Sequence, residues 1–450
     1  MNYSTIQKQD PGLYNIIKKE EDRQKHGLEL IPSENYASEV VLEAMGSILN
    51  DKYAEGYPSK RYYGGNEFID EVEVLCQKRA LEAYGLNSKE WAVNVQPYSG
   101  SPANLEVYFA LMDFGDTLMS LELSEGGHLT HGAGANFSGK AYKAVHYPLN
   151  PKTQTLDYEV IEKLAKEHKP KILLAGYTAY PRSIDFKKFA EIAKEVGAYS
   201  MADISHISGL VAVGEHPSPF PYTDIVTTTT HKLLRGPRSA VIFSKRSTTR
   251  DGKSISELID KAVFPGMQGG PHEHTIAGVA AAFKEARTLQ FKEYAKQVVK
   301  NAKTLAESLI KNGIKLVSGG TDNHLILVDL TPFGSGKGYF VQEALDLAGI
   351  TLNKNTIPGE PVSPFFPSGI RLGTPSLTTR GFKEEEMKQI GKWIAEIINE
   401  VKDYSYDSDK EKRTAEIEKF KKEIKQNGKI KQTKQKVAKM CEKFPVPGID

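Results

Sequence analysis

Apolar residues recur along the chain in short runs, and amphipathic stretches separate them. The runs typical of buried strands are Trp91–Gln96, Lys171–Gly176, Tyr199–Ala202, Ile225–Thr229 and Ala240–Phe243. Apolar residues at helical spacing lie in the intervening stretches, at Ser38–Asp51, Ala103–Met112 and Phe186–Val196. Strands that alternate with helices predict a mostly parallel sheet with right-handed crossovers, and therefore an α/β fold.

The pattern changes after Gly270. One long amphipathic helix is predicted over Lys284–Asn312, where Gly313 ends it. A strand (Leu325–Leu330) and two helices (Gly338–Leu347 and Glu384–Val401) are predicted to follow. We therefore expect an N-terminal arm at residues 1–25, a large α/β domain at 26–285 and a small C-terminal domain with a basic terminal extension at 286–450.

The composition is that of a globular protein. The chain has 450 residues, of which 39% are apolar and 26% are charged, enough for two or three domains. No apolar run approaches the roughly 20 residues of a membrane-spanning helix, and no secretory signal is recognisable. Cys76 and Cys441 cannot form a disulfide framework. These features favour a cytoplasmic protein.

The charges are balanced overall but unevenly placed. The chain has 59 basic and 57 acidic residues, yet Lys410–Lys443 holds 13 basic and 5 acidic residues. Nucleic-acid binding would depend on this segment alone, and it lacks interleaved aromatic residues. We interpret the segment as the solvated face of a terminal helix, with a contact site for an acidic partner as the alternative.

Two candidate chemical groups follow predicted strands. Lys232 closes the run Thr227–Lys232, at the edge of the sheet where open α/β folds bind ligands. A partly desolvated lysine can form a Schiff base with an aldehyde, although a lysine that only reaches solvent from a loop fits equally well. Asp203 ends the run Tyr199–Asp203 and could pair with a protonated pyridine nitrogen, or could cap a helix.

Other residues are suited to bind anions. Ser99, Gly100 and Ser101 precede Pro102 at a predicted helix start, where backbone N–H groups can bind a phosphate. A second glycine-rich turn, at residues 264–271, could add donors, although either loop could be simple turn structure. Arg371 lies between glycines and could bind a carboxylate with two hydrogen bonds or form a structural salt bridge.

The histidines do not indicate a metal site. His128 and His131 form one of several close pairs, but no HExxH motif is present and we expect no metal. His128 follows Gly126-Gly127, so its ring could lie flat over a planar ligand or be held by loop hydrogen bonds.

Taken together, these residues resemble the serine hydroxymethyltransferase family, whose members are fold-type I enzymes that use pyridoxal 5′-phosphate. The matching segments are long, lie in the family's order and extend over most of residues 28–380. They are Leu30–Asn35, Lys52–Pro58, Arg61–Gly65, Gly127–Gly132, Asp203–Leu210, Thr227–Arg238, Gln268–Pro271, Asn353–Thr356 and Ser368–Pro375.

The resemblance implies a fold, a reaction and partners. The fold would be a large domain with a mostly parallel seven-stranded sheet and a smaller C-terminal α/β domain. The reaction would be the reversible transfer of the hydroxymethyl group of L-serine to tetrahydrofolate, giving glycine and 5,10-methylenetetrahydrofolate through an aldimine and a quinonoid. The protein would be at least a homodimer, possibly a tetramer, with shared active sites and no membrane or nucleic-acid partner.

The resemblance also implies residue roles. Lys232 would form the Schiff base, Asp203 would face the pyridine nitrogen, and His128 would stack on the cofactor ring. The other cofactor-binding residues would be Ser99, Gly100, Ser101, Thr178, His206 and His231, with Tyr53, Gly269 and Gly270 from the neighbouring subunit. The substrate would contact Ser33, Glu55, Tyr63, Arg238 and Arg371, with Glu55, Tyr63 and His206 counted among the catalytic residues. The folate pocket would comprise Leu123, Gly127, His128, Leu129, Asn355, Ser363, Pro364 and Phe365.

Two alternatives remain. A folate-independent β-hydroxy amino acid aldolase could use the same fold, although Glu55 and Asn355 favour folate binding. A binding protein without catalysis would have to rely on the basic C-terminal segment. The pair Ser124-Glu125 and that C-terminal segment have no counterpart in the family's pattern, and an extra carboxylate at Glu125 could perturb the folate pocket.

Overall fold

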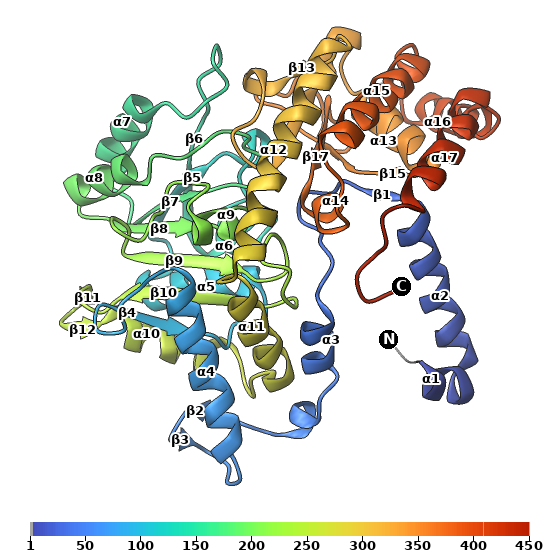
Figure 1. The fold of residues 1–450 in the computed structure, drawn as a ribbon. Coiled ribbons are helices and arrows are strands. Elements are labelled where there is room, and N and C mark those ends of the chain that lie inside the picture. Colours follow the sequence, from blue (N-terminus) through green and yellow to red (C-terminus); the bar gives the residue numbers. More distant parts are fainter. Residues whose placement is uncertain (1–2, 408, 450) are drawn as a thin grey trace. The chain divides into compact units, whose positions relative to one another are not determined.

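The computed structural model describes residues 3–407 and 409–449 and divides into two compact units. The large unit is Ala37–Lys296, and the small unit combines Met1–Tyr36 with Gln297–Asp450 (Figure 1). The division falls within helix α12 (Leu289–Lys311), later than the expected boundary at residue 285. The N-terminal residues belong with the C-terminal part because β1 (Leu28–Glu29) pairs in parallel with β15 (Ile350–Thr351).

A seven-stranded sheet forms the centre of the large unit, in the order β4-β10-β9-β8-β7-β5-β6. Its strands are β4 (Trp91–Asn94), β5 (Thr117–Leu121), β6 (Lys143–Tyr147), β7 (Ile172–Gly176), β8 (Tyr199–Asp203), β9 (Ile225–Thr229) and β10 (Ala240–Lys245). Only β10 runs against both of its neighbours. The other pairs are parallel, so the carboxyl ends of β7, β8 and β9 meet at one edge.

Helices cover both faces of this sheet because its strands bury side chains in both directions. They are α3 (Glu39–Met45), α4 (Glu67–Ala83), α5 (Gly100–Leu111), α6 (Phe137–Ala141), α7 (Tyr158–His168), α8 (Phe186–Val196), α9 (Ser208–Val213), α10 (Ile255–Lys261) and α11 (Glu273–Glu285). On one face Ile242 packs in a core with α5 and α10. On the other, the adjacent Phe243 packs edge to face against Tyr84 and Phe220. The predicted α/β architecture is confirmed.

The small unit is built on an antiparallel sheet in the order β13-β14-β17-β16. Its strands are β13 (Lys315–Leu316), β14 (Leu325–Asp329), β17 (Gly369–Gly373) and β16 (Asn353–Asn355). Its helices are α1 (Ser4–Gln9), α2 (Pro11–His26), α13 (Gly338–Leu347), α14 (Pro375–Thr379), α15 (Glu384–Val401), α16 (Lys410–Ile424) and α17 (Gly428–Cys441), with part of α12. Apolar side chains from β14, β17, α13 and α15 form one core.

The predicted single helix over Lys284–Asn312 is wrong, because α11 ends at Glu285 and α12 begins at Leu289. Thr288 causes the break. Its hydroxyl donates to the Glu285 carbonyl at 2.7 Å and accepts the N–H of Phe291 at 3.2 Å, as an N-cap residue does. Threonine also occurs within helices, so the sequence pattern alone did not reveal this end.

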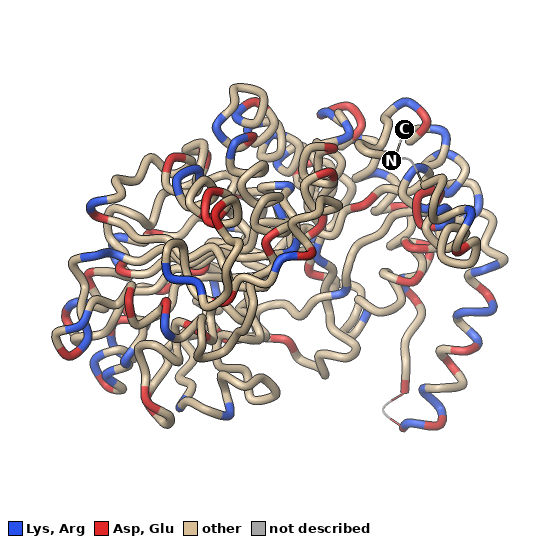
Figure 2. Tube along the Cα trace, turned by 90° about the horizontal axis from the view of Figure 1, so that it is seen from below, with Lys and Arg blue, Asp and Glu red and all other residues tan. Residues whose placement is uncertain are grey.

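The basic C-terminal segment forms helices α16 and α17. Phe420 and Ile424 of α16 and Ile430 and Val437 of α17 are buried in the core of the small unit. Most of the lysines are exposed, and acidic and basic residues are interspersed along the chain (Figure 2). Within residues 3–407 and 409–449, no helix has both the length and the apolar character needed to cross a membrane.

Candidate active site

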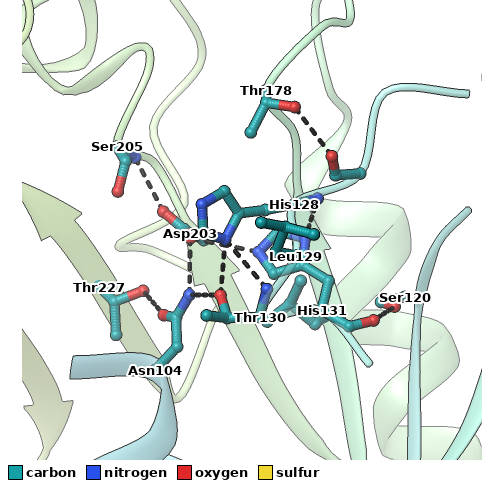
Figure 3. Close-up of polar contacts among 12 residues, drawn as sticks. Asn104, Ser120, His128, Leu129, Thr130, His131, Thr178, Asp203, Ser205 and Thr227 are labelled. Atoms are coloured by element: carbon teal, nitrogen blue, oxygen red, sulfur yellow. Dashed lines mark hydrogen bonds and ion pairs between the residues drawn. The ribbon is translucent and has the colours of Figure 1, made fainter. Parts of the chain in front are cut away.

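The carboxylate of Asp203, at the end of β8, is held by three donors from the large unit (Figure 3). Its Oδ2 accepts from Asn104 Nδ2 at 2.9 Å and from His131 Nε2 at 3.2 Å, and its Oδ1 accepts from the Ser205 N–H at 3.0 Å. Burial by itself would raise the pKa of Asp203, but the bond and charge of His131 and the bond from Asn104 hold it well below its ordinary value. This side chain is therefore an anion at neutral pH.

Asn104, on α5, links this carboxylate to its surroundings. Its Nδ2 also donates to Thr130 Oγ1 at 2.9 Å, and its Oδ1 accepts from Thr227 Oγ1 at 2.8 Å. Thr227 lies on β9 directly opposite Asp203 in the parallel register. The amide is fully buried, so these bonds leave it one orientation.

The loop after β5 places His128 beside this network. His128 Nδ1 lies 2.7 Å from Thr130 Oγ1. The two glycines just before His128 are held by Thr178. Its hydroxyl donates to the Gly127 carbonyl at 2.8 Å and its N–H donates to the Gly126 carbonyl at 2.7 Å. A Cβ on Gly127 would lie 2.3 Å from the Leu121 carbonyl oxygen, so only glycine fits there. The loop is therefore held in one path.

Glu125 belongs to the same loop after β5. It lies in the short 3₁₀ turn Leu123–Glu125, and its carboxylate accepts the backbone N–H of Leu149. The extra carboxylate therefore anchors the loop that carries Leu123 and Gly127.

Lys232 lies just past the end of β9, in a compact loop. Its Nζ donates to Thr229 Oγ1 at 2.8 Å. Two further bonds close the loop, from Gly236 N–H to the Thr230 carbonyl at 2.8 Å and from Thr230 Oγ1 to the Pro237 carbonyl at 2.7 Å. Burial, followed by the charges of Lys232 and Arg238, lowers the pKa of His231 to about 3, so this imidazole is neutral.

Ser99, Gly100 and Ser101 form the beginning of α5. The helix starts at Gly100, two residues before the expected start at Pro102. Ser99 is the N-cap residue, and its side chain makes no capping hydrogen bond. The N-terminal N–H groups of this helix are therefore not satisfied by a capping side chain, which suits a phosphate.

A second cluster in the large unit contains residues assigned to the neighbouring subunit's site. A Cβ on Gly269 would lie 3.3 Å from Glu55 Oε1, and one on Gly270 would lie 3.6 Å from the Tyr53 ring. The rings of Tyr53 and Tyr63 pack edge to face at 5.1 Å. The structure thus brings these residues together on one surface.

Arg61, to which the sequence analysis assigned no role, holds this cluster in place. Its guanidinium donates to the Ala54 and Gly56 carbonyls at 2.9 and 3.0 Å, on either side of Glu55. Glu73, fully buried, balances the charge at 2.7 Å. The backbone around Glu55 is therefore set from inside the protein.

The remaining predicted residues belong to the small unit. Arg371, on β17, donates Nε to Asn353 Oδ1 at 3.1 Å, and burial lowers the pKa of Arg371 to about 10, so it is still a cation at neutral pH. The segment with Ser33 runs beside this strand, because Gly373 N–H donates to the Leu30 carbonyl at 2.8 Å. The folate-pocket residues Asn355, Ser363, Pro364 and Phe365 lie on β16 and the loop that follows it.

Comparison with known proteins decides the family. The family model for serine hydroxymethyltransferase matches residues 6–394. A serine hydroxymethyltransferase from Caenorhabditis briggsae is 48% identical over 462 aligned residues, which cover 99% of this chain and 89% of that protein. The chain belongs to the serine hydroxymethyltransferase family.

Membership of the serine hydroxymethyltransferase family confirms the predicted family, fold class and enzyme class. The family is known to use pyridoxal 5′-phosphate and tetrahydrofolate. The residues present fit the first of these groups. Asp203 is an anion suited to a protonated pyridine nitrogen, and the start of α5 offers N–H donors to a phosphate.

Asn104, Thr130 and Arg61 contribute to these clusters, but the sequence analysis assigned them no role, although Arg61 and Thr130 lie in segments that match the family. His131 was considered only as one member of a histidine pair, yet it contacts Asp203. Asn104 and His131 contact Asp203 from 99 and 72 residues away, and Arg61 contacts Glu73 from 12 residues away. Thr130 is held by Asn104 from 26 residues away, although it also contacts His128 two residues before it. A local pattern therefore held no signal for them beyond their position next to predicted site residues.

Proposed function

We propose that this chain reversibly transfers the hydroxymethyl group of L-serine to tetrahydrofolate, with pyridoxal 5′-phosphate held covalently by Lys232. The observation that carries the proposal is the pairing of β8 with β9, which places Asp203 and Lys232 at the same edge of the sheet. An amine and a carboxylate in that arrangement suit the aldehyde and the ring nitrogen of one planar cofactor.

The cofactor, when bound, would supply an electron sink for the Cα–Cβ bond broken in serine. The protein would supply its surroundings. Ser99, Gly100 and Ser101 would bind the phosphate at the start of α5, His128 would lie on the ring face, and Asp203 would keep the ring nitrogen protonated. Thr178, His206 and His231 complete the set assigned to the cofactor.

Substrate binding would use the residues that the family resemblance assigns to it. Arg371 would bind the serine carboxylate, helped by Ser33 and Tyr63, with Arg238 as a supporting cation. Holding this carboxylate sets the scissile bond relative to the ring plane. Glu55 would move a proton at the serine hydroxyl and at the folate.

Tetrahydrofolate would be bound by residues of the loops after β5 and β16. The proposed contacts are Leu123, Gly127, His128, Leu129, Asn355, Ser363, Pro364 and Phe365. Leu129 and Phe365 are 50% and 77% exposed, so each can give apolar surface to a ligand.

A homodimer is the smallest assembly in this proposal. Tyr53, which is 57% exposed, belongs to the surface cluster with Glu55, Gly269 and Gly270, and Tyr62, which is 81% exposed, packs against Tyr63 of that cluster. Aromatic residues exposed in this way are typical of an interface. Light scattering of the purified protein should therefore give at least twice the mass of the chain, and a monomer with full activity would contradict shared sites.

A cytoplasmic location is proposed as well. Cys76 and Cys441 are both unpaired and buried, as expected in a reducing compartment.

The central experiment compares serine cleavage with and without tetrahydrofolate. Folate-dependent cleavage supports the proposal, whereas equal cleavage without folate would favour the aldolase alternative. Lys232→Ala should abolish both turnover and the visible absorbance of the lysine-bound cofactor, and Lys261→Ala, an exposed lysine of the same unit, serves as the matched control. A Lys232→Ala protein with an unchanged spectrum would refute the assignment.

Glu55 is tested separately. Glu55→Gln should leave cofactor absorbance intact and suppress folate-dependent cleavage of serine, because the amide cannot take up a proton. A wild-type rate in this variant would remove Glu55 from the mechanism.

A further inference from the structure

The hydrogen bonds around His128 determine which ring nitrogen carries its proton. His128 Nδ1 lies 2.7 Å from Thr130 Oγ1 and 3.2 Å from the Thr130 backbone N–H (Figure 3). The backbone N–H can only donate. Nδ1 therefore accepts, and the proton of the neutral ring lies on Nε2. The contact with the N–H is the longer of the two, so the shorter bond to the hydroxyl contributes most to this preference.

The direction of the Thr130 hydroxyl supports the same assignment. Asp203 is an anion and can only accept, so the Asn104 group that faces it is the NH₂. The second hydrogen of that NH₂ points to Thr130 Oγ1 at 2.9 Å. The hydroxyl oxygen thus receives a hydrogen bond from Asn104, which leaves its own hydrogen available for an accepting His128 Nδ1.

Thr227 completes the set of bonds at the other end of Asn104. With the amide oriented by Asp203, Thr227 Oγ1 donates to Asn104 Oδ1 at 2.8 Å. Asn104, Thr130 and Thr227 are all buried. Thr227 therefore donates to Asn104, Asn104 donates to Thr130 and Thr130 donates to His128. Water does not compete for these buried hydrogen bonds.

We propose that Thr130, oriented by Asn104, is a positioning residue that keeps His128 in the Nε2–H tautomer with its ring at a fixed angle. The consequence for cofactor binding rests on the proposed role of His128 as the ring that lies on the cofactor. In that role the neutral tautomer would present a flat face without a positive charge near the cofactor ring nitrogen, which Asp203 would keep protonated. Thr130 itself touches no reacting atom in this assignment.

The experiment reads the tautomer directly. Isotopically labelled histidine is incorporated into the full chain, and the imidazole nitrogen chemical shifts are recorded with and without pyridoxal 5′-phosphate. The chain has 11 histidines, so the His128 signals are assigned by their loss in His128→Gln. Thr130→Val removes the hydroxyl with little change of shape, and Thr130→Ser keeps it.

We expect only the Nε2–H tautomer of His128 in the wild type and in Thr130→Ser at neutral pH. Thr130→Val should show the second tautomer in exchange with the first and should bind the cofactor about five- to tenfold more weakly, as expected for one lost hydrogen bond. Thr130→Ser should restore wild-type affinity to within about twofold.

Three results would overturn the inference. They are a wild-type His128 with its proton on Nδ1, a Thr130→Val spectrum identical to the wild type, and a Thr130→Ser variant as impaired as Thr130→Val. If Thr130→Val does not fold, the wild-type and Thr130→Ser spectra still decide. The cofactor-free spectra keep this test separate from the proposed function, which fails instead if Lys232→Ala retains its absorbance band.

Discussion

Gly100 and Thr229 lie so close together that a Cβ atom on Gly100 would fall 2.5 Å from Cγ2 of Thr229. Gly100 begins α5, and the hydroxyl of Thr229 accepts a hydrogen bond from Lys232. The contact therefore joins the proposed phosphate site to the residue that orients the proposed Schiff-base lysine.

This contact leads to a rescue experiment. Gly100→Ala should weaken pyridoxal 5′-phosphate binding by about tenfold or more, because the added methyl group overpacks a buried contact. Thr229→Ser removes the clashing methyl group and keeps the hydroxyl that Lys232 uses, so the double variant should recover most of the affinity. Affinity is measured by absorbance titration, with Thr229→Ser alone as the control. A double variant as weak as Gly100→Ala would contradict the steric explanation.

Arg380 ties the two ends of the small unit together. Its guanidinium donates to the carbonyls of Gln24 and Gly27 at 3.1 and 2.8 Å, at the end of α2, and to those of Cys441 and Phe444 at 3.3 and 2.8 Å, at the end of α17. The carbonyls of Gln24 and Cys441 belong to last turns, which helices leave without partners, and those of Gly27 and Phe444 lie just beyond the helix ends. One cation thus caps two helices.

Arg380→Lys should therefore lower the free energy of unfolding of the small unit by about 3 kcal/mol, because an ammonium group cannot reach both helix ends. The measurement is urea unfolding, with limited proteolysis of α17 as a second readout. Arg246→Lys is the control, since Arg246 is exposed and its side chain donates to the Ser88 carbonyl. Equal effects of the two substitutions would show that Arg380 has no special role in capping.

Asp203 gives a pH prediction with a definite sign. Its folded-state pKa lies below the unfolded value, so the stability it contributes is present above about pH 4 and is lost as pH falls further. Asp203→Asn should lower the free energy of unfolding by about 2 kcal/mol at neutral pH. We expect the difference from wild type to be constant between about pH 5 and 8 and to shrink below about pH 4. A difference that instead grew on acidification would show that the charged form is not the stabilised one.

Glu106 gives the opposite sign. Its side chain is fully buried, neither carboxyl oxygen has a hydrogen-bond partner in the described structure, and burial raises its pKa to about 8. The unfolded chain releases this proton near pH 4.3, so folding becomes less favourable as pH rises towards 8.

The substitution Glu106→Gln replaces the carboxyl group with an amide that does not ionise, so it should remove this loss of folding stability at higher pH. Its free energy of unfolding relative to wild type should rise by about 1.4 kcal/mol for each pH unit between about pH 5 and 8, measured by urea unfolding. Glu418→Gln, at an exposed position on α16, should show no such slope. Parallel pH profiles for Glu106→Gln and wild type would mean that Glu106 is ionised in the folded protein.

Several elements could be predicted to the residue from local patterns. The structure has α8 at Phe186–Val196, β9 at Ile225–Thr229, α13 at Gly338–Leu347 and α15 at Glu384–Val401, as expected. Helix α8 shows why, because Asp185 caps its start and Gly197, with a φ of 75°, ends it. Such signals lie within the element or next to it. The break before Leu289 was missed because its capping residue, Thr288, is also compatible with a helix interior.

The chain alone determined the alternation of strands and helices, the chemical groups placed after the strands and, through its matching segments, the family to which it belongs. These features are local, or depend only on the order of segments. The tertiary structure decided which groups hold one another. Asn104 and Asp203 are 99 residues apart, and only the packing of α5 against the sheet brings the amide to the carboxylate. Hydrogen bonds need a partner within about 3 Å, and that proximity is a property of the folded chain.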